Sequence, residues 1–239
     1  MSTKNKTIFI TGANSEIATF YIKEKSQDYD CIIAHYRHRH DRIDGLKGVL
    51  EDKLVPVSAD LSSRSDVEKL VEKLKSYEID EFLHVAAPKL RHMRFVKGDL
   101  YEFELEMQVV YWSFFQICQT ILPGMVKRGK GRIVSILTEY TVTNQPPYLS
   151  HYISAKFALL GLMKSLAGEY AVKGIRVNGI SPGLIETDFI SQLPQYVIEN
   201  NAKTTIKGKN LNPSDLISTI SYLLSEESGS INGQNILLQ

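Results

Sequence analysis

Tyr152 and Lys156 have the residue types and the spacing for acid–base chemistry. They lie four residues apart in Y-I-S-A-K, inside a stretch over 152–171 whose composition predicts a helix. Residues at positions i and i+4 share one face of a helix, so the ammonium lies one turn from the phenol. A nearby ammonium favours tyrosinate and lowers the pKa of a tyrosine from about 10 toward neutrality. We expect this phenol to give or take a proton.

A turn near the N-terminus has the spacing of a phosphate-binding loop. Residues 7–11 are a short apolar, β-branched run that predicts a buried strand, and T-G-A-N-S-E-I-A occupies 11–18. Asn14 and Ser15 are good N-cap residues, so a helix is expected over 16–25. A strand, a turn and a helix N-terminus in this order present backbone N–H groups to a pyrophosphate.

Basic residues after the second predicted strand bear on which dinucleotide would bind. The strand over 30–36 leads into H-Y-R-H-R-H at 35–40, and no Asp or Glu stands between Cys31 and His40. An acidic residue there binds a ribose 2′-hydroxyl, whereas an arginine accommodates the additional phosphate of NADP. The sequence therefore favours NADP(H), with Arg39 assisting Arg37. His35 and His38 have no carboxylate or cysteine beside them, so no metal site is predicted.

Strands and helices must alternate along the chain to position these residues. The pattern predicts an α/β, single-domain Rossmann fold over 1–239, with a doubly wound parallel sheet of about seven strands and helices on both faces. The expected strands are 7–11, 30–36, 54–58, 81–85, 132–137, 176–180 and 235–238, and the expected helices are 16–25, 65–75, 100–128, 152–171 and 213–224. The long stretch of weak periodicity over 184–212 is our candidate substrate lid. Apolar pocket walls are expected from this lid and from 141–151, chiefly from Pro146, Pro147, Tyr148, Leu193 and Tyr196.

Composition excludes several classes of protein. The 239 residues carry 28 Lys plus Arg against 27 Asp plus Glu, and a net charge of +1 gives no global attraction to nucleic acid or to an anionic membrane. The two cysteines, Cys31 and Cys118, lack metal-ligand spacing and indicate a reducing compartment. We expect no signal peptide and no run as long as a membrane span, hence a cytoplasmic protein.

Taken in order, these segments resemble the short-chain dehydrogenase/reductase family along nearly the whole chain. The family's T-G-x-x-x-G-x-G is similar to residues 11–18, with Gly12 kept, Glu16 at the second glycine and Ala18 at the third. Its N-N-A-G corresponds to H-V-A-A at 84–87, and its P-G-x-x-x-T to P-G-L-I-E-T at 182–187. Alanine at position 18 is tolerated, because this position needs only a small residue for helix-to-sheet packing. The Glu16 carboxylate would repel a nearby phosphate. We therefore expect its side chain to face solvent in the first helical turn.

The resemblance implies two sets of residues. Tyr152, Lys156 and Thr138 correspond to the catalytic positions, where Thr138 replaces the family's serine and keeps a hydroxyl for the substrate oxygen, with Ser135 and Thr141 as fallback hydroxyls. The NADP(H)-binding residues implied by the resemblance are Gly12, Ser15, Ile17, Arg37, Asp60, Leu61, Ala86, Ala87, Tyr152, Lys156, Pro182, Gly183, Ile185 and Thr187. The family's relay asparagine falls on Val110, or near Gln108 if the register differs, so proton delivery is expected to be altered.

The implied activity is NADPH-dependent reduction of a ketone or a 3-oxoacyl thioester, with Tyr152 as general acid. Segments 124–138 and 174–188 are most similar to the 3-oxoacyl-acyl-carrier-protein reductases of the family. The basic stretch 126–132 is either a docking site for an acidic acyl carrier protein or a solvated loop. A homodimer or homotetramer packed through the long helices is implied, with Tyr111, Trp112, Phe114 and Phe115 at the contact.

Two other functions fit the same residues. The departures at Glu16, His84, Val85 and Val110 are compatible with a degenerate member that binds a dinucleotide or a partner and acts as a sensor or scaffold. An NAD-dependent alcohol oxidant shares the site and differs from our interpretation at Arg37 alone.

Overall fold

Seven parallel strands form the centre of the protein. The computed structural model describes residues 6–205 and 208–239, so most of the N-terminal segment in which we expect no signal peptide lies outside the described residues. The sheet order is β3-β2-β1-β4-β5-β6-β7, and every adjacent pair is parallel. The strands are β1 (Thr7–Thr11), β2 (Cys31–Tyr36), β3 (Leu54–Ser58), β4 (Glu81–His84), β5 (Gly131–Ile136), β6 (Ile175–Pro182) and β7 (Asn235–Leu238). The predicted doubly wound sheet is confirmed.

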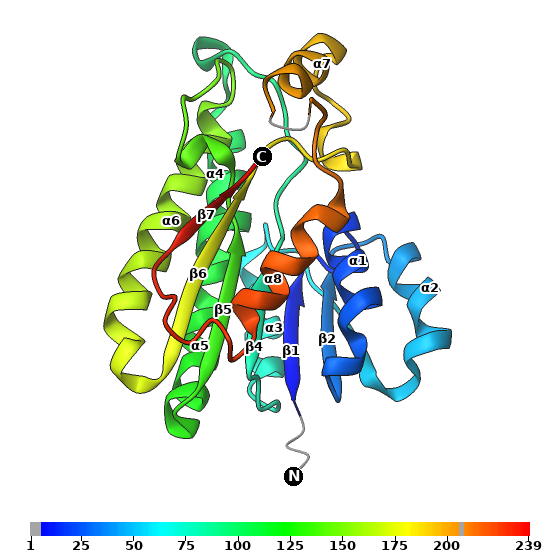
Figure 1. Cartoon of the computed structure of the whole chain (residues 1–239), viewed down its shortest axis with the longest axis vertical. Helices are drawn as coiled ribbons and strands as arrows, with labels where there is room; N and C mark the ends of the chain where they lie inside the picture. Colours follow the sequence, from blue (N-terminus) through cyan, green and yellow to red (C-terminus); the bar gives the residue numbers. More distant parts are fainter. Residues whose placement is uncertain (1–5, 206–207) are drawn as a thin grey trace.

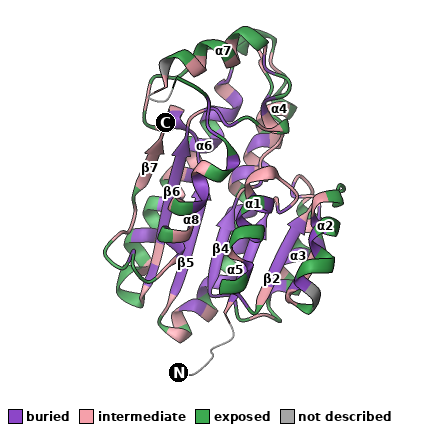
Figure 2. Ribbon diagram, turned by 45° about the vertical axis from the view of Figure 1, so that its right-hand side comes forward, coloured by how far each residue is buried: buried purple, intermediate pink, exposed green. Residues whose placement is uncertain are grey.

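Helices cover both faces of this sheet (Figure 1). Successive side chains of β1 show the division, because Phe9 packs into the core beneath α3, α5 and α6 while Ile8 and Ile10 pack beneath α1, α2 and α8. The central strands are buried, the edge strand β7 is of intermediate burial, and the exposed residues lie mainly on the outer helix surfaces and in loops (Figure 2). The helices are α1 (Glu16–Lys25), α2 (Asp41–Leu50), α3 (Arg64–Leu74), α4 (Leu100–Glu106), α5 (Ser113–Arg128), α6 (Ser150–Tyr170), α7 (Gln195–Thr204) and α8 (Ile217–Leu224).

Helix α2 is absent from our sequence prediction, and its start is stabilised from elsewhere in the chain. Its sequence D-R-I-D-G-L-K-G-V-L holds two glycines, which weaken helix propensity. Ile43, Leu46 and Leu50 form a buried face. The side-chain oxygen of Asn14 accepts from the backbone N–H groups of Arg42 and Ile43 at 3.0 and 3.2 Å. A residue of the first loop therefore caps α2.

The predicted helix over 100–128 is one continuous helical stretch with a π-helical segment, η4 (Met107–Trp112), between α4 and α5. Our expectation of no run as long as a membrane span is wrong on length and composition, since an 18-residue window of this 29-residue helix has a mean hydropathy of 1.3. In the fold, α5 packs Phe114, Ile117 and Met125 into the core. Its apolar side chains therefore cover the sheet.

The segment 184–212 is more ordered than its weak periodicity indicates. It holds the short helix η7 (Asp188–Ile190) and α7, and Ile185 forms an isolated bridge with Leu211. Residues 206–207 lie outside the described residues. Helix α7 stands beyond the carboxyl ends of the strands (Figure 1). This is the edge at which ligands bind in open parallel sheets.

Candidate active site

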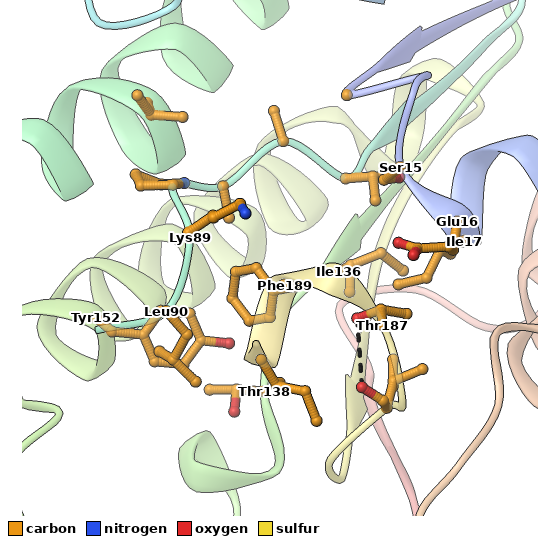
Figure 3. Close-up of a pocket in the computed structure, with 18 of the residues that line it drawn as sticks. Ser15, Glu16, Ile17, Lys89, Leu90, Ile136, Thr138, Tyr152, Thr187 and Phe189 are labelled. Atoms are coloured by element: carbon orange, nitrogen blue, oxygen red, sulfur yellow. Dashed lines mark hydrogen bonds between the residues drawn. The ribbon is translucent and has the colours of Figure 1, made fainter. Parts of the chain in front are cut away.

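A cavity of about 600 Å³ opens at the carboxyl ends of the strands. It lies beside the point where the strand order reverses, between β1 and β4. Every residue that the sequence analysis assigns to cofactor or catalysis lines it: Gly12, Ser15, Ile17, Arg37, Asp60, Leu61, Ala86, Ala87, Thr138, Tyr152, Lys156, Pro182, Gly183, Ile185 and Thr187. In Figure 3, Tyr152 and Thr138 lie on one side of this space and Ser15, Glu16 and Ile17 on the other.

The first loop is built closely against β4. Gly12 has a φ of +66°, and a Cβ there would lie 3.0 Å from the backbone nitrogen and Cα of Ala86. Only glycine fits such a turn, because its φ is positive and the backbone of Ala86 approaches it closely. Ser15 caps α1 by accepting from the N–H of Ala18 at 3.3 Å. The first N–H groups of a helix have no partner within it, so the start of α1 offers donors to an anion in the cavity.

His35 fixes this loop through hydrogen bonds of both ring nitrogens. Its Nδ1 accepts from the N–H of Gly12 at 3.2 Å, and its Nε2 lies 3.0 Å from the carbonyl oxygen of Ala59. This arrangement requires the neutral tautomer with the proton on Nε2. Burial lowers the pKa of His35 to about 4. Within residues 6–205 and 208–239, no group of three or more His, Cys, Asp or Glu is placed to hold a metal.

We expected the Glu16 side chain to face solvent, but in the structure it is bonded to two other segments of the chain. Its Oε1 lies 2.9 Å from Nη2 of Arg42 and accepts from the backbone N–H of Asp188 at 3.2 Å. The same Arg42 nitrogen lies 2.9 Å from the Asp188 carboxylate. The first loop, α2 and the segment after β6 therefore meet at one charged cluster, which we call the Glu16 cluster and which comprises Glu16, Arg42 and Asp188. The arginine offsets the negative charge that Glu16 brings to the loop.

Arg37 and Asp60 pair with each other at the opposite end of the first loop. Nε and Nη2 of Arg37 lie 2.9 and 2.8 Å from one carboxylate oxygen of Asp60, and the other oxygen accepts from the N–H and hydroxyl of Ser62. The Arg37 side chain remains 60% exposed. An exposed pair of this kind contributes little to stability, so its guanidinium can exchange partners at small cost.

Thr138, Tyr152 and Lys156 meet at the other end of the cavity. Thr138 follows β5, and its side chain acts on the Tyr152 phenol so as to lower the pKa of Tyr152. Nζ of Lys156 donates to the carbonyl oxygen of Ile136 at 2.7 Å and lies 5.7 Å from the centre of the Tyr152 ring. The Phe189 ring lies 6.0 Å from the Tyr152 ring, and Tyr152 is only 5% exposed.

The pKa of Tyr152 is shifted in the direction opposite to our expectation. Burial raises the Tyr152 pKa, and this effect outweighs the opposite effect of the Thr138 side chain. Burial also lowers the pKa of Lys156 to about 8. Both changes have one cause, because an apolar surrounding disfavours the charged form of each group.

His84 and Val110 replace the asparagines that the family carries. Nδ1 of His84 lies 2.8 Å from the Thr11 hydroxyl, and Nε2 lies 3.1 Å from the backbone carbonyl oxygen of Val110. The buried imidazole thus connects β1, β4 and the π-helical segment, and its burial lowers the pKa of His84 to about 3. Gln108, the alternative relay residue, is buried and does not line the cavity.

The substrate end combines two residues of the predicted lid, Phe189 and Ile190, with residues that the sequence analysis missed. Its walls come from the loop after β4, from α4 and from the residues after β5 and β6: Lys89, Leu90, Arg91, Glu102, Leu105, Val109, Glu139, Tyr140, Phe189 and Ile190. The predicted walls at 146–148, Leu193 and Tyr196 do not line the cavity, and neither do the fallback hydroxyls Ser135 and Thr141. The N–H of Leu90 donates to the carbonyl oxygen of Phe189 at 3.2 Å. This bond holds the loop after β4 against Tyr152. Such a contact between distant segments cannot be inferred from a pattern of neighbouring residues.

Two surface predictions change in the folded protein. Phe114 is fully buried in the core, so of the aromatic residues predicted at a subunit contact only Trp112 and Phe115 are exposed. The two arginines of the basic stretch 126–132 turn inward: Arg128 donates to the Ile79 carbonyl, and Arg132 donates to the Ser225 carbonyl at 2.7 Å. These two arginine side chains are therefore neither solvated nor free to dock an acidic partner.

Known proteins are similar to this chain in sequence and in fold. Residues 22–239 match the family described as enoyl-(acyl carrier protein) reductase. The 3-oxoacyl-[acyl-carrier-protein] reductase FabG of Thermotoga maritima is 26% identical over 99% of this chain and 97% of its own. Dehydrogenase/reductase SDR family member 4 of Rattus norvegicus is 29% identical over 98% of this chain and 86% of its own.

A solved structure agrees in fold. The gluconate 5-dehydrogenase of Burkholderia cenocepacia J2315, in complex with NADP and tartrate, superposes with a TM-score of 0.87 at 21% identity over 98% of this chain and 93% of its own. With the parallel sheet and the cavity at its carboxyl edge, these matches settle the family. The chain is a member of the short-chain dehydrogenase/reductase family of oxidoreductases, which bind a nicotinamide dinucleotide.

Proposed function

We propose that this protein is an NADPH-dependent carbonyl reductase that acts on a ketone or a 3-oxoacyl thioester. The observation that carries the proposal is the meeting of Thr138, Tyr152 and Lys156 at one end of a cavity whose other end holds Arg37. A cavity of about 600 Å³ lies within the range of small-molecule and cofactor sites. Its position beside the start of α1 fits a bound dinucleotide.

Each end of the cavity fits a different part of the cofactor. Arg37 is exposed and offers a guanidinium to the 2′-phosphate, and the Ser15-capped start of α1 offers N–H donors to the pyrophosphate. Pro182, Gly183, Ile185 and Thr187 line the wall at the nicotinamide. The cofactor supplies the hydride. Glu16 fits because Arg42 holds its carboxylate at 2.9 Å.

The protein's own residues handle the proton and the substrate oxygen. Thr138 lines the cavity together with Tyr152 and orients the carbonyl oxygen beside the Tyr152 hydroxyl. Tyr152 donates its proton to that oxygen as general acid. The Lys156 ammonium stabilises the phenolate that Tyr152 becomes. Phe189 and Leu90 exclude water from this end, and the segment 184–212 acts as the lid that admits the substrate.

The substrate class follows from the walls and from one relative. Leu90, Leu105, Val109 and Ile190 make an apolar wall, which suits the alkyl part of a ketone or acyl chain. FabG of Thermotoga maritima bears the name of a 3-oxoacyl-[acyl-carrier-protein] reductase. We extend that substrate class to this chain, with an acyl carrier protein or coenzyme A as the thioester partner.

Titration with NADPH tests the proposal directly. Nicotinamide fluorescence should report micromolar binding that survives in Tyr152→Phe, and a panel of ketones and 3-oxoacyl thioesters should be reduced by the wild type only. Binding without turnover on any compound would favour a non-catalytic dinucleotide-binding protein. The Glu16 cluster gives that alternative a structural basis, because it already joins the two sides of the cavity. Failure to bind NADPH would contradict the proposal.

A further inference from the structure

Glu106 is a buried carboxyl that the proposed function leaves unexplained. It is the last residue of α4 and is 2% exposed. Its Oε2 has no hydrogen-bond partner within the part of the chain that the structure describes. Burying a carboxyl in this way costs free energy unless a charge or a proton compensates it. The buried Glu106 carboxyl therefore lowers the stability of the fold, and the groups around it indicate which residues it can influence.

The neighbours of Glu106 include two of the predicted catalytic residues. Phe103 lies one turn earlier on the same face of α4, and its ring is 6.0 Å from the ring of His151 on α6. This contact turns that face of α4 toward the first turns of α6, which carry Tyr152 and Lys156. Glu106 interacts electrostatically with both of them.

Two other charged groups act on Glu106 from nearby elements. Glu102 lies on α4 and Arg91 in the loop after β4, and the two form an ion pair with each other. Their effects on the Glu106 pKa are opposite in direction, since Glu102 raises it and Arg91 lowers it. Lys156 remains as the buried cation whose charge Glu106 can compensate.

We propose that Glu106 is a positioning residue for carbonyl reduction, and that its buried carboxyl group, as it ionises, keeps Lys156 in the ammonium form. The inference rests on the proposed reductase function, since the ammonium matters when Tyr152 loses a proton. In that step the O–H bond of Tyr152 breaks, the proton goes to the carbonyl oxygen, and the electron pair stays on the phenolate. The hydride from the bound cofactor supplies the two electrons that reduce the carbon. The Lys156 ammonium then faces the new negative charge.

The electrostatics of the pair are consistent with this role. Burial raises the pKa of Glu106 to about 8 and lowers that of Lys156 to about 8, while each charge favours the other. As the pH rises through this range, the carboxylate that forms opposes the loss of the lysine proton. Replacing Glu106 with a neutral residue removes that opposition, so Lys156 becomes neutral at a lower pH.

The direct test is an NMR titration of Lys156. Protein labelled with ¹³C-lysine is titrated, and the Cε resonance of Lys156 is assigned by its absence in Lys156→Arg. In Glu106→Gln the midpoint should fall by about one pH unit or more. Glu104→Gln is the matched control, because Glu104 is exposed on the same helix and the change in net charge is identical. An unchanged midpoint in Glu106→Gln would overturn the proposal.

A kinetic measurement then separates this inference from the proposed function. The alkaline limb of the kcat/KM profile for ketone reduction should move to lower pH in Glu106→Gln by the same amount as the NMR midpoint. A midpoint that moves while the limb stays fixed would also overturn the positioning role. If the wild type reduces no carbonyl compound, the proposed function fails, and the titration, which needs no substrate, still decides whether Glu106 governs Lys156.

Discussion

The two ends of the cavity differ in the burial and the pairing of their charged groups. At the dinucleotide end, Arg37, Asp60 and the Glu16 cluster lie at the surface, and each charge is paired with another. At the catalytic end, Tyr152, Lys156 and Glu106 are each no more than 5% exposed. There, Oε2 of Glu106 and the ring nitrogens of His151 lack hydrogen-bond partners within residues 6–205 and 208–239.

This difference separates binding from chemistry. Solvent-exposed ion pairs are screened and exchange partners at small cost in free energy. The ion pairs of the dinucleotide end can therefore open to bind a phosphate. Buried groups are held in a low-dielectric surrounding, where one charge shifts the pKa of its neighbour strongly. Substitutions at the buried end should therefore have large effects on turnover or stability, and those at the exposed end smaller effects on affinity.

The largest effect is expected from Tyr152→Phe. Removing the phenol should lower kcat for ketone reduction by about 10²- to 10⁴-fold, because the general acid is lost, while the NADPH dissociation constant changes little. Stopped-flow or steady-state kinetics with fluorescence titration measure the two quantities. Tyr196→Phe is the matched control, since Tyr196 is 60% exposed on α7. An equal loss in both variants would contradict the assignment.

A large effect on acid stability is expected from His84→Asn. Since the folded pKa of His84 is about 3, below the usual 6.5, the stability that the neutral imidazole contributes is present above pH 6.5 and is lost as the pH falls. Between pH 7 and pH 5, the free energy of unfolding should decrease by about 2 kcal/mol less in the variant than in the wild type. Urea unfolding at the two pH values measures this. His38→Asn, at an exposed histidine, should behave as the wild type, and an unchanged pH dependence in His84→Asn would refute the prediction.

A smaller effect is expected from Arg37→Gln at the exposed end. NADPH should bind about 10-fold more weakly, because one charged contact to the 2′-phosphate is lost, and NADH should bind as before. Parallel fluorescence titrations with both cofactors measure the difference. Arg39→Gln should change it less, since the sequence analysis gives Arg39 only an assisting role beside Arg37. A wild-type preference for NADH would refute the role of Arg37.

The smallest effect is expected from Glu16→Gln. Removing one partly buried carboxylate beside the phosphate-binding loop should tighten NADPH binding by roughly threefold. Isothermal titration calorimetry at low salt measures it, and added salt should reduce the difference. Glu24→Gln on the exposed side of α1 is the control. Weaker binding in Glu16→Gln would mean that the cluster holds the cavity in a binding-ready form.

Much of the fold and the site could be predicted from patterns of short range. The capped turn at Ser15, the Tyr152 and Lys156 spacing and the strand runs depend on residues close in sequence. The residues predicted to bind the cofactor or to take the three main catalytic roles all line one cavity. Helix α2 could not be predicted in this way, because its cap, Asn14, lies 28 residues before Arg42. The substrate walls were missed for the same reason, since Leu90 meets Phe189 only in the folded chain.

The sequence by itself determined the order of elements, the loops that carry the site and the identity of its acid and base candidates, because each depends on periodicity and spacing along the chain. Only the tertiary structure decided which of these groups are buried and which charges they meet. It placed Glu16 against Asp188, 172 residues away, and Glu106 within the electrostatic reach of Lys156. Burial and long-range contacts set the pKa values and the ion pairs, and neither is encoded in local sequence.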